Sequence, residues 1–74
     1  MTLEKLKSLV FRRPFQPLRL VLDSGESYEV RHPESVIVAK AGCVVVDDAK
    51  DLIAVFEVDQ VSAVEYRKAS RARR

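Results

Sequence analysis

The spacing of apolar residues changes once along this chain, between Pro14 and Pro17. Before the change, apolar residues recur every three or four positions, the period of one helical face: Leu3, Leu6, Leu9 and Val10. After it, apolar and polar residues alternate, which is the period of a half-buried strand. The sequence therefore predicts one N-terminal helix followed by β-structure alone.

The signals at both ends of the helix agree with this prediction. Thr2 can cap the first turn, and Glu4 lies where the helix dipole favours an acid. Pro14 lacks an amide hydrogen and restricts the residue before it, so the helix must stop there. We expect a helix of about three turns with one apolar stripe.

The first two strands form a predicted hairpin. Residues 18–22 alternate, Asp23-Ser24-Gly25 supplies turn chemistry, and residues 27–31 return. His32-Pro33 then interrupts the pattern, because a proline must face an edge or a bulge. The second strand is therefore expected to be bent or split at this point, and it resumes at residues 36–39.

Three more strands follow at residues 43–46, 52–58 and 61–66, which makes about five short strands in all. Tight turns without intervening helices favour a small barrel or sandwich. The segment 52–58 is apolar on nearly both faces, so we expect the helix or a neighbouring subunit to shield it. Residues 1–66 form one predicted domain, and residues 67–74 a basic, disordered tail.

The charge is divided along the chain. Residues 1–19 carry a net +4 and residues 67–74 a net +5, whereas residues 20–66 carry −7. Any affinity for a polyanion must therefore lie at the termini. The candidate nucleic-acid-binding residues are Arg12, Arg13, Arg67, Lys68, Arg71, Arg73 and Arg74. A solvated, solubilising tail is the equally weighted alternative.

No pattern of catalytic or metal-binding residues is found. His32 is the only histidine and Cys43 the only cysteine. The sequence therefore provides neither a set of ligands for structural zinc nor an internal disulfide. His32-Pro33 is interpreted as a structural break, and Cys43 as a small buried hydrophobe. Asp47, Asp48 and Asp51 fail the EF-hand pattern and are interpreted as a solvated hairpin tip. We expect no enzyme activity, no cofactor, no metal and no small-molecule substrate.

The order of elements resembles the Sm-like (LSm, including the bacterial Hfq type) family over residues 2–66. Residues 18–25 look like the family's first strand and glycine turn, and Phe56 to Val64 look like its fourth strand, connector and fifth strand. The run from Arg13-Pro14-Phe15 through residues 28–34 also resembles a group of small uncharacterised bacterial proteins. The resemblance implies a mainly β fold: an N-terminal α-helix followed by a five-stranded, strongly bent antiparallel SH3-like/Sm-like barrel.

Sm-like proteins form rings by pairing the fourth strand of one subunit with the fifth of the next, and many bind uridine- or adenosine-rich RNA. The resemblance thus implies a homo-oligomer, with RNA or another polyanion as a candidate ligand at the basic termini. The candidate subunit-interface residues are Leu52, Ile53, Val55, Phe56, Val61 and Val64. The alternative is a protein-interaction or structural module that binds no nucleic acid.

The expected location is cytoplasmic, without membrane attachment. No apolar run approaches the roughly 20 residues that span a bilayer, and the N-terminus lacks a signal-peptide core. A chain this short buries only about 60% of its unfolded surface, and without disulfides or metal it is expected to gain stability by self-association.

Overall fold

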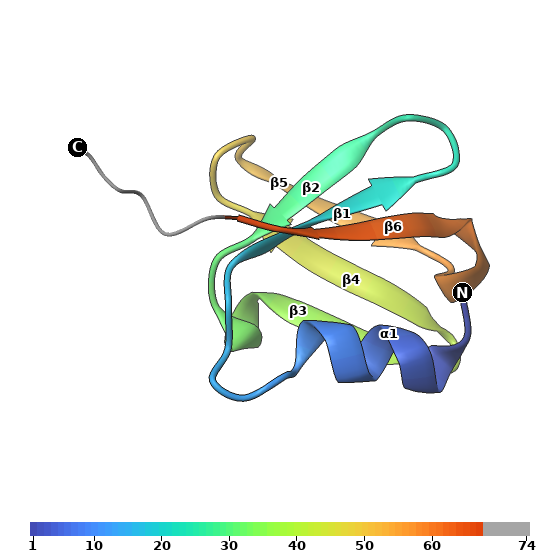
Figure 1. Ribbon diagram of the computed structural model, residues 1–74. Helices are drawn as coiled ribbons and strands as arrows, with labels where there is room; N and C mark the ends of the chain where they lie inside the picture. Colours follow the sequence, from blue (N-terminus) through green and yellow to red (C-terminus); the bar gives the residue numbers. More distant parts are fainter. Residues whose placement is uncertain (68–74) are drawn as a thin grey trace.

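The computed structural model describes residues 1–67, which form one helix and six strands in two three-stranded antiparallel sheets (Figure 1). The elements, in chain order, are α1 (Leu3–Val10), β1 (Leu18–Leu22), β2 (Ser27–Val30), β3 (Val36–Ala39), β4 (Gly42–Asp47), β5 (Leu52–Phe56) and β6 (Val61–Tyr66). One sheet has the order β2-β1-β6 and the other β3-β4-β5. The predicted mainly β fold with a single N-terminal helix is confirmed.

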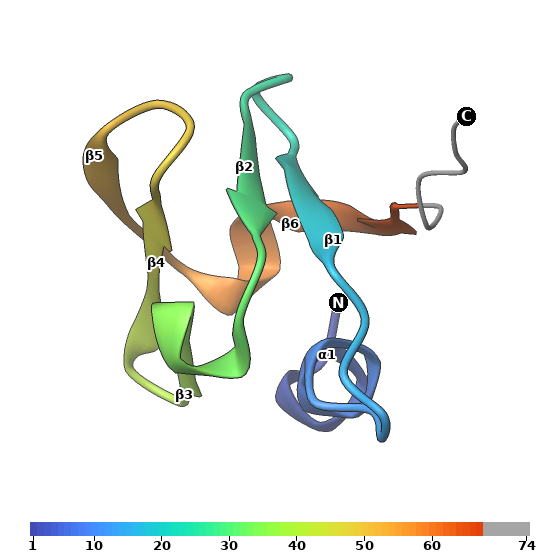
Figure 2. The same ribbon diagram turned by 90° about the vertical axis from the view of Figure 1, so that its left-hand side faces the viewer.

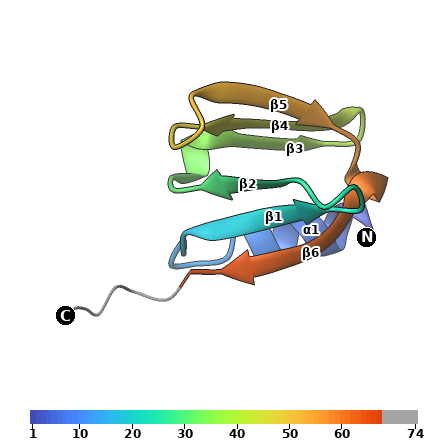
Figure 3. The same cartoon turned by 90° about the horizontal axis from the view of Figure 1, so that it is seen from above.

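The predicted five-stranded barrel is wrong in two respects, because residues 1–67 form six strands and no closed barrel. The second strand is split, as one of the two expectations had it, by a short 3₁₀ turn over Pro33–Ser35. Pro33 has no amide hydrogen to donate, so the backbone ladder does not continue from β2 into β3. The two sheets therefore meet without a shared ladder (Figure 3).

Side chains at the end of β4 and in the turn after it join the sheets where the backbone does not. The Glu29 amide at the free edge of β2 donates to Asp47 Oδ2 at 2.8 Å, and the Lys50 amide donates to Asp47 Oδ1 at 3.1 Å. Lys50 Nζ also donates to the Ser27 carbonyl on β2. Asp47 is fully buried, which corrects its interpretation as part of a solvated tip. An unpaired strand edge needs such partners once it is removed from water.

The helix packs against β3 in one sheet and β6 in the other (Figure 2). Its amphipathic face brings Leu6 and Val10 into the core, where both are fully buried. Thr2 caps α1 by accepting from the Lys5 amide at 3.1 Å, as predicted. The helix ends at Val10 and is shorter than expected. The Tyr66 hydroxyl donates to the Leu9 carbonyl at 2.6 Å and fixes the helix to β6.

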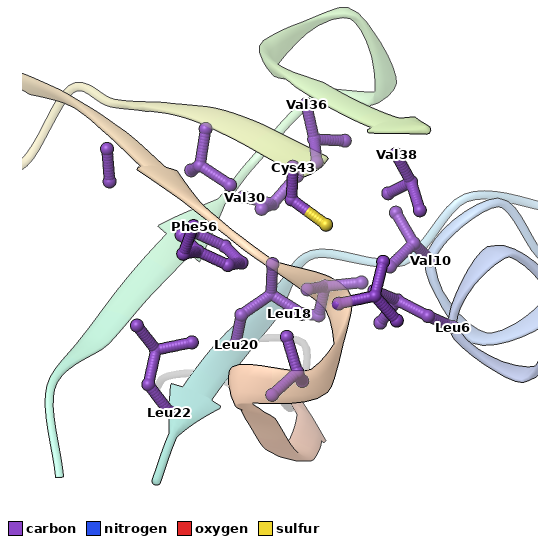
Figure 4. Packing of buried hydrophobic residues seen from close by; sticks show 14 residues of the cluster. Leu6, Val10, Leu18, Leu20, Leu22, Val30, Val36, Val38, Cys43 and Phe56 are labelled. Carbon is purple, nitrogen blue, oxygen red and sulfur yellow. The ribbon is translucent and has the colours of Figure 1, made fainter. Parts of the chain in front are cut away.

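The core is one cluster of aliphatic side chains around Phe56 (Figure 4). Leu18 and Leu20 on β1 are fully buried beside it, and so is Cys43, as predicted. Gly25 adopts a φ of +95°, the left-handed region that the predicted hairpin turn requires. None of the helices in residues 1–67 has the length and apolar character needed to cross a bilayer.

Candidate functional site

The outer face of the β3-β4-β5 sheet is apolar although no described element covers it. Side chains alternate across a strand, so Val36, Val38 and Val45 point into the core while their neighbours point outward. The outward residues are aliphatic and lie opposite one another on adjacent strands: Ile37 with Val44, Val44 with Val55, and Val46 with Ile53. Ile37 is 60% exposed, Ile53 67% and Val55 74%. We call these five residues, Ile37, Val44, Val46, Ile53 and Val55, the outer patch.

Contiguous exposed apolar side chains of this kind are typical of interaction sites. The patch contains no charged residue, in a chain of which 32% is charged. Sequence reasoning found Ile53 and Val55 because residues 52–58 are apolar on both faces. It missed Ile37, Val44 and Val46, because short valine runs do not show which member faces solvent.

Two strand edges add backbone groups to this surface. β5 ends the β3-β4-β5 sheet and β6 ends the β2-β1-β6 sheet, and neither has a strand on its outer side within residues 1–67. Figure 3 shows β5 and β6 at opposite ends of the series of strands. The other two sheet ends are occupied, since Asp47 and Lys50 bond to β2 and α1 packs against β3.

The hydrogen bonds between β6 and β1 determine which amide groups of β6 face outward. The Arg67 amide donates to the Pro17 carbonyl at 2.9 Å, so Glu65, two residues earlier, also bonds toward β1. Backbone groups alternate in direction along a strand. Val64 and Tyr66 therefore present their amides and carbonyls at the outer edge.

The same reasoning applies to β5. The two-residue turn between Ala39 and Gly42 makes this pair hydrogen-bonded, so even-numbered β4 residues bond toward β3 and odd-numbered ones toward β5. Cys43 and Val45 pair with Phe56 and Ala54, which leaves the amides of Ile53 and Val55 at the outer edge. At the end of this row, the Glu57 amide donates to Gln60 Oε1 at 2.8 Å and is therefore not free to pair with a neighbouring strand.

The candidate interface residues divide into three environments. Leu52, Ile53 and Val55 are exposed, and Val64 is half-buried. Phe56 and Val61 belong to the core, so their side chains stabilise the strands that carry the edges. Exposure and edge position coincide only at Ile53 and Val55.

The structure describes three of the predicted basic residues, Arg12, Arg13 and Arg67. Arg12 lies with its guanidinium 5.0 Å from the centre of the Tyr66 ring, a cation–π contact that fixes its direction. Arg67 pairs with Glu29 at 2.6 Å. Lys68, Arg71, Arg73 and Arg74 lie outside the described residues.

Arg12 and Arg13 share a hollow with apolar rings. Its volume is about 360 Å³, and its other lining residues are Phe11, Pro14, Phe15 and Pro33. Neither arginine forms an ion pair with a carboxylate of residues 1–67. The hollow thus combines cations with aromatic surface, which suits an anionic, partly apolar ligand.

The described residues contain no group of three or more His, Cys, Asp or Glu side chains placed to hold a metal ion. Burial raises the pKa of the Cys43 thiol, and partial burial followed by the charge of Glu26 raises the pKa of the Tyr28 hydroxyl. Both shifts favour the neutral, unreactive form of the group.

Comparison with known proteins gives no match, whether to a family model, to a curated protein or to a solved structure.

Proposed function

We propose that this chain is a non-enzymatic, Sm-like assembly protein, in which β5 of one copy pairs with β6 of the next. The observation that carries the proposal is the pair of open edges on β5 and β6, with the exposed Ile53 and Val55 on one of them. An open edge in a sheet is a template for another strand, and monomeric proteins blunt it with lysines, prolines or a covering loop. β5 and β6 contain neither lysine nor proline.

Two different open edges on every copy favour head-to-tail contacts. Such contacts form a closed ring or an open filament, whereas a two-fold β5–β5 dimer would leave both β6 edges unpaired. The edge pairing also accounts for the strand that is apolar on both faces. α1 packs against β3 and β6, so a neighbouring subunit is the remaining candidate to cover β5.

Light scattering after size-exclusion chromatography tests the proposal. The full chain is expected to elute at several times its monomer mass of 8.4 kDa. Val55→Lys places a charge on the β5 edge at a side chain already in solvent, so it should give monomers without unfolding the chain. Ile37→Lys is the matched control, because it places the same charge on the same sheet face two strands from that edge.

The Val55→Lys variant should be monomeric and the Ile37→Lys variant oligomeric. A full chain that stays strictly monomeric at high concentration contradicts the proposal. It would favour the alternative, in which the outer patch and the β5 edge receive a different protein.

Polyanion binding is a second candidate function, and it is favoured by the hollow that holds Arg12 and Arg13. A guanidinium held over an aromatic ring keeps its N–H groups free to bind phosphate, and exposed aromatic side chains can stack with unpaired bases. The ligand would be single-stranded RNA, as the resemblance implies, or another flexible polyanion.

Binding of short U-rich and A-rich RNA at low and moderate salt tests this function. Arg12→Gln with Arg13→Gln should lower affinity and flatten its salt dependence, because each lost phosphate contact removes one released counterion. Lys40→Gln, in the turn between β3 and β4, is the control. A chain that ends at Tyr66 shows whether the basic tail contributes, and no binding by any version excludes this second function.

A further inference from the structure

The outer patch lies between two hairpin turns of opposite charge. Lys40 lies in the turn between β3 and β4, whereas Asp48 and Asp51 lie in the turn between β4 and β5, and all three are exposed. Consecutive antiparallel strands place these two turns at opposite ends of the sheet. Lys40 is five residues before Val45, near the middle of β4, and the two acids are three and six residues after it. The patch therefore has a positive end and a negative end, at similar distances from its middle.

The charges at both ends are available to a partner. None of these three side chains forms an ion pair within residues 1–67. The neighbouring charges of opposite sign are held elsewhere: Lys50 Nζ donates to the Ser27 carbonyl, and the Glu57 side chain accepts from the Gln60 amide. Each end of the patch therefore keeps its own sign.

A hollow of about 430 Å³ lies where the patch meets its acidic end. Its walls are three aliphatic and three acidic residues: Val46, Leu52 and Ile53, with Asp47, Asp48 and Asp51. A lysine packs its methylene groups along apolar surface while its ammonium group stays beside polar partners. The hollow therefore suits a lysine side chain that enters from the side of the outer patch.

Two apolar sheet faces can stack as in a β-sandwich, about 10 Å apart and with their strands nearly aligned. For two copies of this sheet, a two-fold axis along the strands would place like ends together. Asp48 and Asp51 of one copy would then face the same two acids of the other. Like charges across an interface cost free energy, so this orientation is disfavoured.

A two-fold axis across the strands places unlike ends together. The Lys40 end of each copy then lies over the acidic end of the other, because in a two-fold interface each contact occurs twice with the roles exchanged. Since the patch is centred between its two ends, Val44 of one copy lies over Val46 of the other, and Val55 over Ile53. The charges and the apolar side chains are thus matched in the same orientation.

We infer that the outer patch packs face to face against the outer patch of a second copy, with the strands of the two sheets antiparallel and Lys40 of each copy in the hollow of the other. The acidic end repels a polyanion, whereas a patch with one end of each sign is complementary to itself. This contact uses the sheet face and leaves the edges of β5 and β6 free, so it does not depend on the proposed edge pairing. It accounts for the exposure of Ile53 and Val55, 67% and 74% in the single chain.

The mass of the full chain in solution tests whether the patch is used. Val46→Lys places a charge on the central strand of the sheet, at an exposed side chain that is not on an edge, so its mass by light scattering and sedimentation should be half that of the wild type. Val21→Lys is the matched control, because it makes the same change on the outer face of β1, the central strand of the other sheet. It should keep the wild-type mass. Circular dichroism shows whether each variant folds, and Val46→Thr carries the test if Val46→Lys does not.

Charge reversal tests the orientation. Lys40→Asp should raise the dissociation constant of this pairing about tenfold, because two ion pairs are lost and replaced by repulsion. Adding Asp48→Lys and Asp51→Asn to the same chain should restore the wild-type value, since the two ends then attract each other with their signs exchanged. Asparagine is chosen at position 51 because Asp51 has a φ of 55°, a region that asparagine tolerates. Sedimentation velocity across a concentration series measures the dissociation constant.

The possible outcomes separate this inference from the proposed function. A halved mass for Val46→Lys, with loss in Lys40→Asp and rescue by the added substitutions, supports the inference. A wild-type dimer that Val46→Lys converts to a monomer also supports it, and contradicts the edge pairing instead. An unchanged mass for Val46→Lys overturns the inference and leaves the edge pairing intact. A halved mass without any effect of Lys40→Asp overturns the inferred orientation, and a monomeric wild type overturns both proposals.

Discussion

The carboxylate of Asp47 is fully buried and accepts hydrogen bonds from two backbone amides, one on β2 and one in its own turn. Asp47→Ala leaves both amides without an acceptor. The free energy of unfolding should fall by about 2 to 4 kcal/mol, because two part-buried hydrogen bonds to a charged acceptor are lost. Urea denaturation followed by circular dichroism measures this loss.

Asp47→Asn should fall between the wild type and the alanine variant, since one of its two oxygens is replaced by an N–H donor. Asp48→Ala, at an exposed position in the same turn, is the control and should change stability by less than about 0.5 kcal/mol. Equal effects of Asp47→Ala and Asp48→Ala would show that the carboxylate does not join the two sheets.

Cys43 makes stability depend on alkaline pH. Burial raises the pKa of its thiol in the folded chain, so the folded state keeps the proton at a pH where the unfolded chain loses it. This contribution is complete below the ordinary thiol pKa of about 8.5 and is lost as pH rises through the raised value. Between about pH 7 and 9.5, which brackets that ordinary value, urea denaturation should show a steeper loss for the wild type than for Cys43→Ala.

The two proteins are compared by the slope of their unfolding free energy against pH, because Cys43→Ala also removes core volume and lowers stability at every pH. Tyr28, whose pKa is raised too, loses its proton at higher pH and is common to both chains. Parallel pH profiles of the two proteins would contradict the assignment to Cys43.

At the scale of single elements, α1 depends on β6 through one hydrogen bond. The Tyr66 hydroxyl donates to the Leu9 carbonyl at 2.6 Å, near the end of the helix. Tyr66→Phe removes this bond but keeps the ring beneath Arg12, so we expect a loss of about 1 kcal/mol. Thermal unfolding followed by circular dichroism measures it.

Tyr28→Phe is the matched control, because its hydroxyl bonds at 3.3 Å to the exposed Glu26. That variant should be nearly neutral. If both variants lose the same small amount, the Leu9 contact contributes no more to stability than a bond at the surface.

The elements themselves were largely predictable from local pattern. The change of apolar period located α1 and the first strand, and the His32-Pro33 break marked the division between β2 and β3. The pattern could not separate a bent strand from a split one, because the outcome depends on whether a neighbouring ladder spans the break. The length of β5 was overestimated for a similar reason, since Val58 is buried but belongs to a 3₁₀ turn.

The functional surface was less predictable. Asp47 appeared to be a polar turn residue, because its acceptor role exists only once β2 lies beside that turn. Ile53 and Val55 were identified from a strand without a polar face. That their amides lie at an open sheet edge follows from the strand order and the hydrogen-bond pairing. The alternation of apolar and polar residues in the sequence shows neither of these.

At the scale of the whole molecule, the two open edges and the small core both favour association. A domain of this size buries only about 60% of its unfolded surface, so its stability alone is small. Val64 is half-buried although it faces the core, which indicates that this core is incomplete on the β6 side. Association would cover that side and lower the free energy of the folded chain.

Stability should therefore depend on protein concentration. Only the folded chain can assemble, so a higher concentration favours folding by mass action, up to about 1.4 kcal/mol per chain for each tenfold increase. For a domain this small, that corresponds to a rise in Tm of several degrees per tenfold increase in concentration. Calorimetry across two decades of concentration should show this rise for the wild type and for Ile37→Lys. Val55→Lys should unfold at one concentration-independent Tm, and a Tm independent of concentration in all three proteins would show that assembly does not stabilise this fold.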